Sequence, residues 1–187
     1  MKLLQGLVLG TFFLIVGGIV ALFALGLRPG AGTLVSDITI ARPPAIVWRW
    51  LTEPVRIARW TSWVADVKQD SLAPGAAGSR QSWQLVDPNL HDRVPITGTV
   101  TEQDAPRMLR MQVRTPGLFE SVRTWTLEPV AGGTHLSQIE RVHYDVWAAR
   151  FMEPLVTPQA QRRMAGDQAR LKQLAESAPA APDSLAR

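Results

Sequence analysis

The sequence predicts an α+β domain attached to one N-terminal transmembrane helix. Three observations lead to this prediction. The first 27 residues are strongly apolar, residues 34–144 alternate strand-like segments with turn residues, and the chain then changes to helical spacing. Short turns between successive strands favour antiparallel pairing, because parallel neighbours need long crossover connections. We therefore expect an antiparallel sheet that a C-terminal helix covers on one side.

The N-terminal apolar run, Leu7 to Leu27, contains no charged side chain. As a helix rising about 1.5 Å per residue it would span roughly 31 Å, close to the hydrocarbon thickness of a bilayer. A cleaved signal peptide is the alternative, but its apolar region typically has about 7–15 residues and precedes a small-x-small cleavage site. The longer run here continues into Arg-Pro-Gly. We predict an uncleaved anchor over residues 1–28 and a linker over residues 29–33.

Charges around the anchor predict its orientation. Lys2 and the terminal amine precede the span, while Arg28 follows it, and a tiny basic tail favours a cytoplasmic N-terminus. We expect a single-pass membrane protein whose domain is extracytoplasmic. Gly6 and Gly10 form a GxxxG pattern that could pack a second anchor helix closely and give a homodimer, but the simpler interpretation is that glycine is common in membrane spans.

Composition excludes several functional classes. Of the 20 Lys and Arg residues only Lys2 precedes Arg28, and none of the 16 Asp and Glu residues does, so the domain has a small positive excess with interspersed signs. A nucleic-acid-binding protein needs a denser basic face, so we expect no nucleic-acid partner. The chain has no cysteine, which excludes disulfides, thiolate metal sites and cysteine nucleophiles.

The domain is predicted over residues 34–177, with a disordered Ala- and Pro-rich tail over residues 178–187. The predicted strands are residues 34–40, 64–69, 79–86, 94–103, 108–114, 119–128 and 134–144. The predicted helices are residues 45–51 with Pro44 in the first turn, 55–60, 147–156 and 159–177. Pro158 is expected to separate the last two helices. The apolar stripe of the longest helix comprises Ala160, Met164, Leu171 and Ala175, with Gln168 in its middle.

This order of elements is that of the helix-grip fold, and particular residues agree with it. They are Ile38-Thr39-Ile40-Ala41-Arg42-Pro43-Pro44-Ala45-Ile46-Val47-Trp48, Leu51-Thr52-Glu53-Pro54, Trp60, Trp125-Thr126-Leu127-Glu128-Pro129, Gly132-Gly133-Thr134 and Arg170-Leu171-Lys172-Gln173-Leu174-Ala175-Glu176. The chain resembles the SRPBCC or START-like superfamily, particularly its polyketide cyclase/dehydrase and lipid-transport-like branch. The resemblance implies a curved sheet that grips the last helix around a cavity for an apolar or amphipathic molecule.

Alternation along the last two strands is compatible with either a buried or an exposed position for two charged residues. If Leu127 lies opposite Leu136 across the turn at residues 129–133, antiparallel register places Trp125 beside Gln138 and Arg123 beside Glu140. Such a pair could anchor a polar group of a ligand. The alternative is a one-residue slip that leaves both charges in solvent, which is the commoner position of Arg and Glu.

Several residues are candidates to line the cavity, because aromatic, thioether and forked polar side chains suit lipid-like ligands. The candidates are Trp83, Met111, Arg123, Trp125, Gln138, Glu140, Tyr144, Met152 and Met164. Core packing is the alternative for the tryptophans and methionines. No metal site is expected, because His91, His135 and His143 lack ligand spacing. No cofactor motif and no catalytic residue is assigned.

The expected function is a membrane-anchored binding module for a hydrophobic or lipid-like small molecule, without catalysis. One alternative is a cyclase, dehydratase or isomerase in which Arg123, Glu140 or Tyr144 orients a polar substrate. A second alternative is a protein-interaction module in which Trp and Met side chains fill the cavity. A fold alone cannot choose among them.

Overall fold

One antiparallel sheet forms most of the domain in the computed structural model, which describes residues 2–26, 32–70, 72–86, 93–145 and 147–178, with side chains at all of these except 2–4, 25–26 and 147–152. In sheet order its seven strands are β1 (Thr33–Ile40), β7 (Gly133–Tyr144), β6 (Phe119–Val130), β5 (Met108–Thr115), β4 (Val94–Asp104), β3 (Arg80–Leu85) and β2 (Val64–Gln69). Each predicted strand is present, and its ends differ from the prediction by two residues at most.

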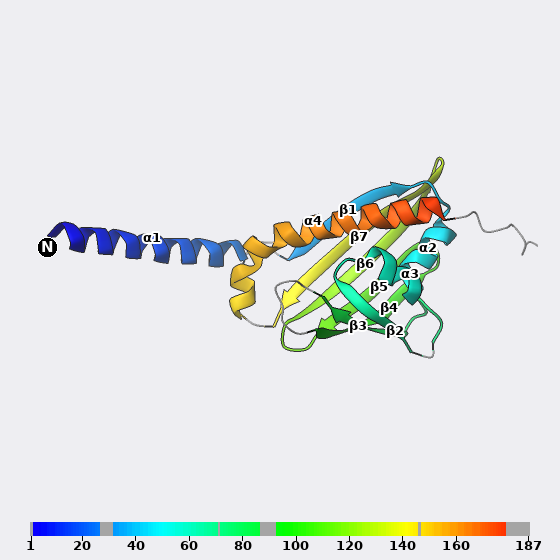
Figure 1. Cartoon of the computed structure of the whole chain (residues 1–187), viewed down its shortest axis with the longest axis horizontal. Coiled ribbons are helices and arrows are strands. Elements are labelled where there is room, and N and C mark those ends of the chain that lie inside the picture. The colour runs from blue at the N-terminus through cyan, green and yellow to red at the C-terminus, as the bar shows by residue number, and fades with distance from the viewer. Residues whose placement is uncertain (1, 27–31, 71, 87–92, 146, 179–187) are drawn as a thin grey trace, which may run out of the picture.

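The C-terminal helix α4 (Trp147–Ser177) lies along the sheet near β1 (Figure 1). The prediction of two helices divided at Pro158 was wrong, because one helix continues through both Pro154 and Pro158. Proline removes a helical hydrogen bond and pushes its ring against the preceding turn, which can kink a helix instead of ending it. Figure 1 shows this outcome, since the first turns of α4 run at a steep angle to the rest.

Side chains of α4 cover the outer edge of β1, which pairs with β7 on its other side. Lys172 Nζ donates to the carbonyl of Thr39 at 2.5 Å, and Glu176 Oε1 accepts from the backbone N–H of Ala41 at 2.7 Å. Gln161 and Gln168 make further bonds to the same strand. The unpaired edge of a sheet is a template for aggregation, so these bonds both dock α4 and protect β1.

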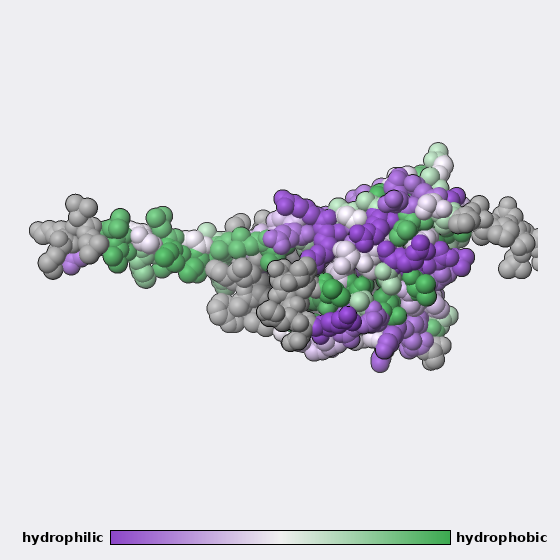
Figure 2. Space-filling model, in the orientation of Figure 1, coloured by the Kyte–Doolittle hydropathy of each residue, from purple (hydrophilic) through white to green (hydrophobic). Residues whose placement is uncertain are grey.

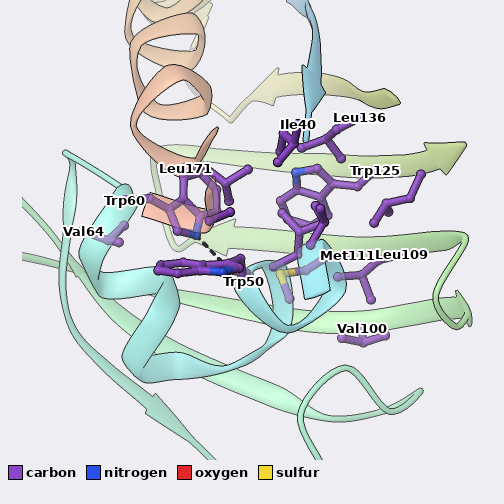
Figure 3. Packing of buried hydrophobic residues seen from close by; sticks show 14 of the residues in the cluster. Ile40, Trp50, Trp60, Val64, Val100, Leu109, Met111, Trp125, Leu136 and Leu171 are labelled. Carbon is purple, nitrogen blue, oxygen red and sulfur yellow. Dashed lines mark hydrogen bonds between the residues drawn. The ribbon is translucent and has the colours of Figure 1, made fainter. Parts of the chain in front are cut away.

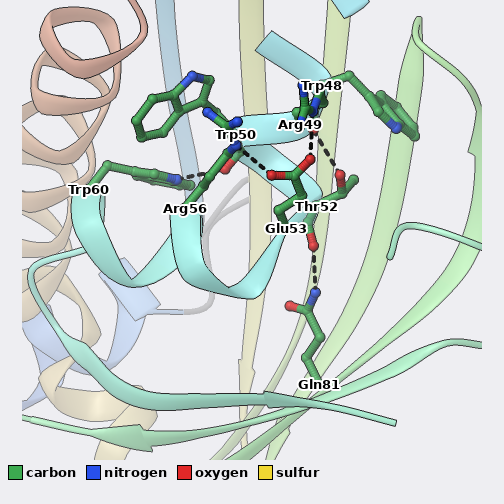
Figure 4. Close-up of polar contacts among 8 residues, drawn as sticks. All are labelled: Trp48, Arg49, Trp50, Thr52, Glu53, Arg56, Trp60 and Gln81. Carbon is green, nitrogen blue, oxygen red and sulfur yellow. Dashed lines mark hydrogen bonds and ion pairs between the residues drawn. The ribbon is translucent and has the colours of Figure 1, made fainter. Parts of the chain in front are cut away.

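Two short helices, α2 (Pro44–Thr52) and α3 (Pro54–Trp60), follow β1 as predicted, each with a proline in its first turn. Glu53 ends the first and begins the second. It accepts hydrogen bonds from Arg49 at 2.6 Å and Arg56 at 2.5 Å (Figure 4). Burial raises the pKa of Glu53, but the two arginines outweigh it and hold the pKa below its ordinary value. The junction of α2 and α3 also contacts the sheet, because Gln81 Nε2 donates to the carbonyl of Thr52 at 3.1 Å.

The hydrophobic core fills the space between the sheet, α2, α3 and the second half of α4 (Figure 3). The Trp60 indole donates to the carbonyl of Trp50 at 2.8 Å, which joins α3 to α2 inside this core. From α4, Leu171 and Ala175 are fully buried and Met164 nearly so, while Ala160 is half-buried. The predicted stripe is therefore the face of α4 that the domain buries. The whole arrangement is the helix-grip fold.

The N-terminal helix α1 (Lys2–Gly26) projects from the domain and contacts α4 (Figure 1). Its segment Gln5–Ala24 has a mean hydropathy of 2.6, enough to cross a membrane, although a signal sequence meets the same criterion. Figure 2 shows apolar surface along α1 and polar surface along the outer face of α4. Most of the predicted linker and tail, residues 29–31 and 179–187, lies outside the described residues, and the predicted domain boundaries stay predictions.

Candidate functional site

A cavity of about 310 Å³ lies between the first half of α4 and the end of the sheet at which β1 begins. Its apolar wall comprises Leu34, Trp60, Trp63, Leu85, Phe119, Val142, Ala160 and Met164. Its polar wall comprises Thr61, Arg123, Gln138, Glu140, Tyr144, Arg163 and Asp167. An apolar hollow with a few converging polar groups is typical of a small-molecule site.

A second pocket lies deeper in the domain and has room for about 10 Å³, the size of a single water molecule. Its wall includes Trp83, Met111 and Trp125, which all belong to the hydrophobic core. Gly98 lets two of them pack, because a Cβ there would lie 2.7 Å from Trp83 Cη2 and 2.8 Å from Met111 Sδ. Side chains therefore fill most of the inner half of the domain, whereas the outer half holds the larger cavity.

Arg123 and Glu140 form a buried ion pair where the two cavities meet. They are 6% and 5% exposed. Arg123 Nε and Nη2 each donate to a different oxygen of Glu140 at 2.9 Å, and Ser121 Oγ donates to Glu140 Oε1 at 2.7 Å. A bidentate pair with a further donor is the geometry that offsets the cost of removing two charges from water. The observed register pairs Arg123 with Glu140, Trp125 with Gln138 and Leu127 with Leu136, which confirms the predicted register.

Two tryptophans flank the guanidinium of Arg123. Its Cζ lies 5.2 Å from the centre of the Trp63 ring and 5.5 Å from that of Trp125. The faces of aromatic rings carry partial negative charge, so each ring stabilises a nearby cation. Together with Glu140, these contacts fix Arg123 on the wall of both cavities.

A second polar chain crosses from the sheet to α4. The Trp125 indole donates to Gln138 Oε1 at 3.1 Å, and Gln168 Nε2 donates to the same oxygen at 3.2 Å. Gln168 Oε1 accepts from Ser36 Oγ at 2.7 Å. These bonds engage the side-chain oxygen of Gln138 and both ends of the Gln168 amide, so both residues hold α4 against β7 and β1.

Two titratable groups in the cavity wall have raised pKa values. Burial raises the pKa of the Asp167 carboxyl, against a hydrogen bond from Ser62 and the charges of Arg170 and Arg163. Burial, with the negative charges of Glu153 and Glu140, raises the pKa of the Tyr144 hydroxyl. Tyr144 is therefore neutral at physiological pH, and its polarity resides in a hydroxyl group.

Residues 31–176 match the model of the family described as polyketide cyclase / dehydrase and lipid transport. The chain belongs to this family. The match spans the sheet, α2, α3 and nearly all of α4, so the whole cavity lies within the polyketide cyclase/dehydrase and lipid-transport domain. No curated protein matches the chain.

Solved structures show the same fold at low sequence identity. Protein CV1439 from Chromobacterium violaceum has a TM-score of 0.64 and 18% identity, over 79% of this chain and 99% of its own. TTHA0849 from Thermus thermophilus has a TM-score of 0.63 and 17% identity, over 78% and 99%. DynU16, a putative protein in the dynemicin biosynthetic locus, has a TM-score of 0.56 and 18% identity, over 78% of this chain and 48% of its own.

The predicted site residues divide between the two cavities of this family domain. Arg123, Gln138, Glu140, Tyr144 and Met164 line the larger cavity. Trp83, Met111 and Trp125 border only the small inner pocket, so they pack as core, and contact between them and a ligand stays a prediction. The side chain of Met152 lies outside the described residues.

Sequence reasoning missed several residues of the cavity, among them Trp63, Phe119, Arg163 and Asp167. Trp63 lies in the turn between α3 and β2, where no helical or strand periodicity predicts which way its side chain points. Asp167 lies beside the predicted stripe of α4 and contacts the distant turn before β2, where the Ser62 backbone N–H donates to it at 3.0 Å.

The histidines play no part in the described site. His135 Nε2 lies 3.7 Å from Asp37 on the exposed face, His143 is exposed, and His91 lies outside the described residues. Across the described chain, no group of three or more His, Cys, Asp or Glu side chains could hold a metal ion.

Proposed function

We propose that this chain is a membrane-anchored module that binds a hydrophobic or lipid-like small molecule. The observation that carries the proposal is the cavity of about 310 Å³ between α4 and the sheet. Its volume falls at the lower end of the range of small-molecule sites, roughly 300–1,000 Å³. The family description, which includes lipid transport, supports the same class of ligand.

The position of the cavity supports delivery from a bilayer. Strand pairing brings Thr33 beside Arg141, and Phe119 beside both Thr115 and Tyr144, so these strand ends form one end of the sheet. The cavity opens at this end, and α1 joins the chain there, only a few residues before Thr33. With α1 in a membrane, the cavity lies close to the lipid surface.

Ligand capture by the full chain tests the proposal. Ala160 is half-buried in the cavity wall, whereas Ala169 is exposed on the same helix. Ala160→Phe fills the cavity, and Ala169→Phe adds the same ring to solvent. Each protein is purified from membranes, and the small molecules that it retains are extracted and identified by mass spectrometry.

We expect a lipid-like compound in near-stoichiometric amount from the wild type and from Ala169→Phe, and its loss from Ala160→Phe. The proposal fails if the wild type carries no such compound and also binds no apolar fluorescent probe. Equal retention by Ala160→Phe would place the compound on α1 or in the surrounding membrane.

An enzyme of the cyclase or dehydratase type is the second candidate, favoured by one observation. Asp167 lies in the cavity wall with a raised pKa, a property common among groups that transfer protons. An enzyme would convert the compound captured above into a product of different mass, and Asp167→Asn would stop this conversion while retaining binding. Recovery of an unchanged compound after incubation with the wild type would leave binding as the function.

A further inference from the structure

We infer that the cavity selects an uncharged ligand whose polar end is a hydrogen-bond acceptor, such as an ester or ketone, over the corresponding carboxylate. The inference rests on the proposed function, because it specifies which ligand the proposed binding site takes. Two observations carry it: the balance of charges around the cavity, and the N–H groups of Arg123 Nη1, which bind no acceptor among the described residues.

The charged side chains around the larger cavity cancel. Arg123 and Arg163 are positive, Glu140 and Asp167 are negative, and these four are the charged residues among the described lining. Arg123 and Glu140 are paired at 2.9 Å, and Asp167 follows Arg163 by one helical turn. A ligand carboxylate would therefore bring an uncompensated charge to a desolvated site beside Glu140, which is unfavourable.

Arg123 can nevertheless donate a hydrogen bond to a ligand. Its Nε and Nη2 bind Glu140, whereas Nη1 has no acceptor within the part of the chain that the structure describes. The guanidinium also contacts the rings of Trp63 and Trp125, which help to hold it in place. Because it is already oriented, a neutral acceptor that reaches the inner end of the cavity gains a hydrogen bond without ordering Arg123. The apolar residues toward the opening, including Leu34 and Phe119, then contact the rest of the ligand.

Three brominated probes test the inference with the full chain in amphipols at pH 8. They are 12-bromododecanoic acid, its methyl ester and 1-bromododecane, which share a chain and differ in the polar end. Bromine quenches tryptophan fluorescence on contact, and Trp60 and Trp63 in the cavity wall report binding. We expect the ester to bind at least tenfold more tightly than the ionised acid, and several-fold more tightly than bromododecane.

Variants assign the selectivity to the ion pair. Glu140→Gln removes one negative charge and should raise the affinity for the acid at least tenfold, with little change for the ester. Glu120→Gln is the matched control, because Glu120 also pairs with an arginine, Arg114 at 2.8 Å, but on the exposed side of the sheet. Asp167→Asn should shift selectivity in the same direction if Glu140→Gln does not fold.

The outcomes separate the inference from the proposed function. Acid binding as tight as ester binding in the wild type overturns the inference and leaves a binding module with different selectivity. An unchanged ratio of acid to ester affinity in both Glu140→Gln and Asp167→Asn also overturns it. Absence of quenching by all three probes instead contradicts the proposed function itself.

Discussion

Individual contacts determine whether a charged side chain can be buried in an apolar domain, and Arg123 is the clearest example. Its charge is balanced by Glu140 and flanked by two tryptophan rings, so removal of one partner leaves the other buried. Such an unpaired group is much more costly than the intact pair is favourable. The pair therefore stabilises the domain only while both members are present.

Arg123→Met should lower the free energy of unfolding by about 3–5 kcal/mol, since Glu140 then lies buried without its partner. Arg123→Met combined with Glu140→Met should recover most of this loss. The control is Arg114→Met, whose pair with Glu120 is exposed and should not change stability measurably. Urea denaturation measures all three, and a double variant no more stable than the single one would contradict the argument.

Gly98→Ala tests whether the inner half of the domain is filled. Its Cβ would lie under 3 Å from both Trp83 and Met111, so we expect a loss of about 1–3 kcal/mol. Gly166→Ala is the control, because Gly166 lies in α4 with no atom within 4 Å of the added Cβ, and helix propensity predicts a gain of up to about 1 kcal/mol. A neutral result at Gly98 would mean that the inner pocket has spare room.

At the scale of single residues, the sequence was informative where strand alternation decides which face of the sheet a side chain occupies. The register of β6 and β7 followed from one short turn, and it placed Arg123 beside Glu140. It failed at Asp167 and Trp63, whose surroundings come from segments distant in sequence. Local periodicity carries no information about such contacts.

The bounds of helices and strands were predicted well where turn residues mark their ends. They were predicted poorly where a helix contains proline. Pro44 and Pro54 each occupy a first helical turn, where the missing N–H is harmless. Pro154 and Pro158 lie inside α4, which continues through both and contacts β1 and α1. Whether proline ends or bends a helix thus depends on tertiary contacts, which the sequence pattern does not contain.

Asp167→Asn tests how α4 is held against the turn before β2. A carboxyl whose pKa is raised in the folded protein contributes stability that is present below its unfolded pKa and is lost as pH rises through the folded pKa. The wild type should lose this contribution as pH rises above about 3.8, and the uncharged amide should not. The melting temperature of the variant relative to wild type should therefore be higher at pH 7 than at pH 3.5. A relative melting temperature that falls with rising pH would contradict this account.

The molecule as a whole places an open cavity at the end of the domain nearest α1. The helix-grip fold was predictable from the order of elements, but the division into a filled inner half and an open outer half was not. That division depends on whether Trp83, Trp125 and Met111 meet across the sheet, a property of three-dimensional packing. The open outer half also differs from the core closed throughout that the interaction-module alternative assumed.

Exposed apolar residues at the cavity end should assist ligand uptake from membranes. Leu118 is 42% exposed in the turn between β5 and β6, beside Asp145, whose N–H donates to its carbonyl. Leu118→Glu should slow transfer of a bound probe from vesicles several-fold, because a carboxylate resists entry into the lipid interface. Val130→Glu is the control, since Val130 is 41% exposed at the opposite end of β6. Equal slowing by both variants would indicate a general effect of charge.

The short connection between α1 and β1 also limits where the protein can act. Seven residue steps separate Gly26 from Thr33, so the two can lie at most about 25 Å apart. If α1 is inserted in a bilayer, the domain can reach only the leaflet above which α1 holds it. Its occupancy would then follow the mole fraction of ligand among neighbouring lipids, and dilution of the aqueous phase would leave that occupancy unchanged.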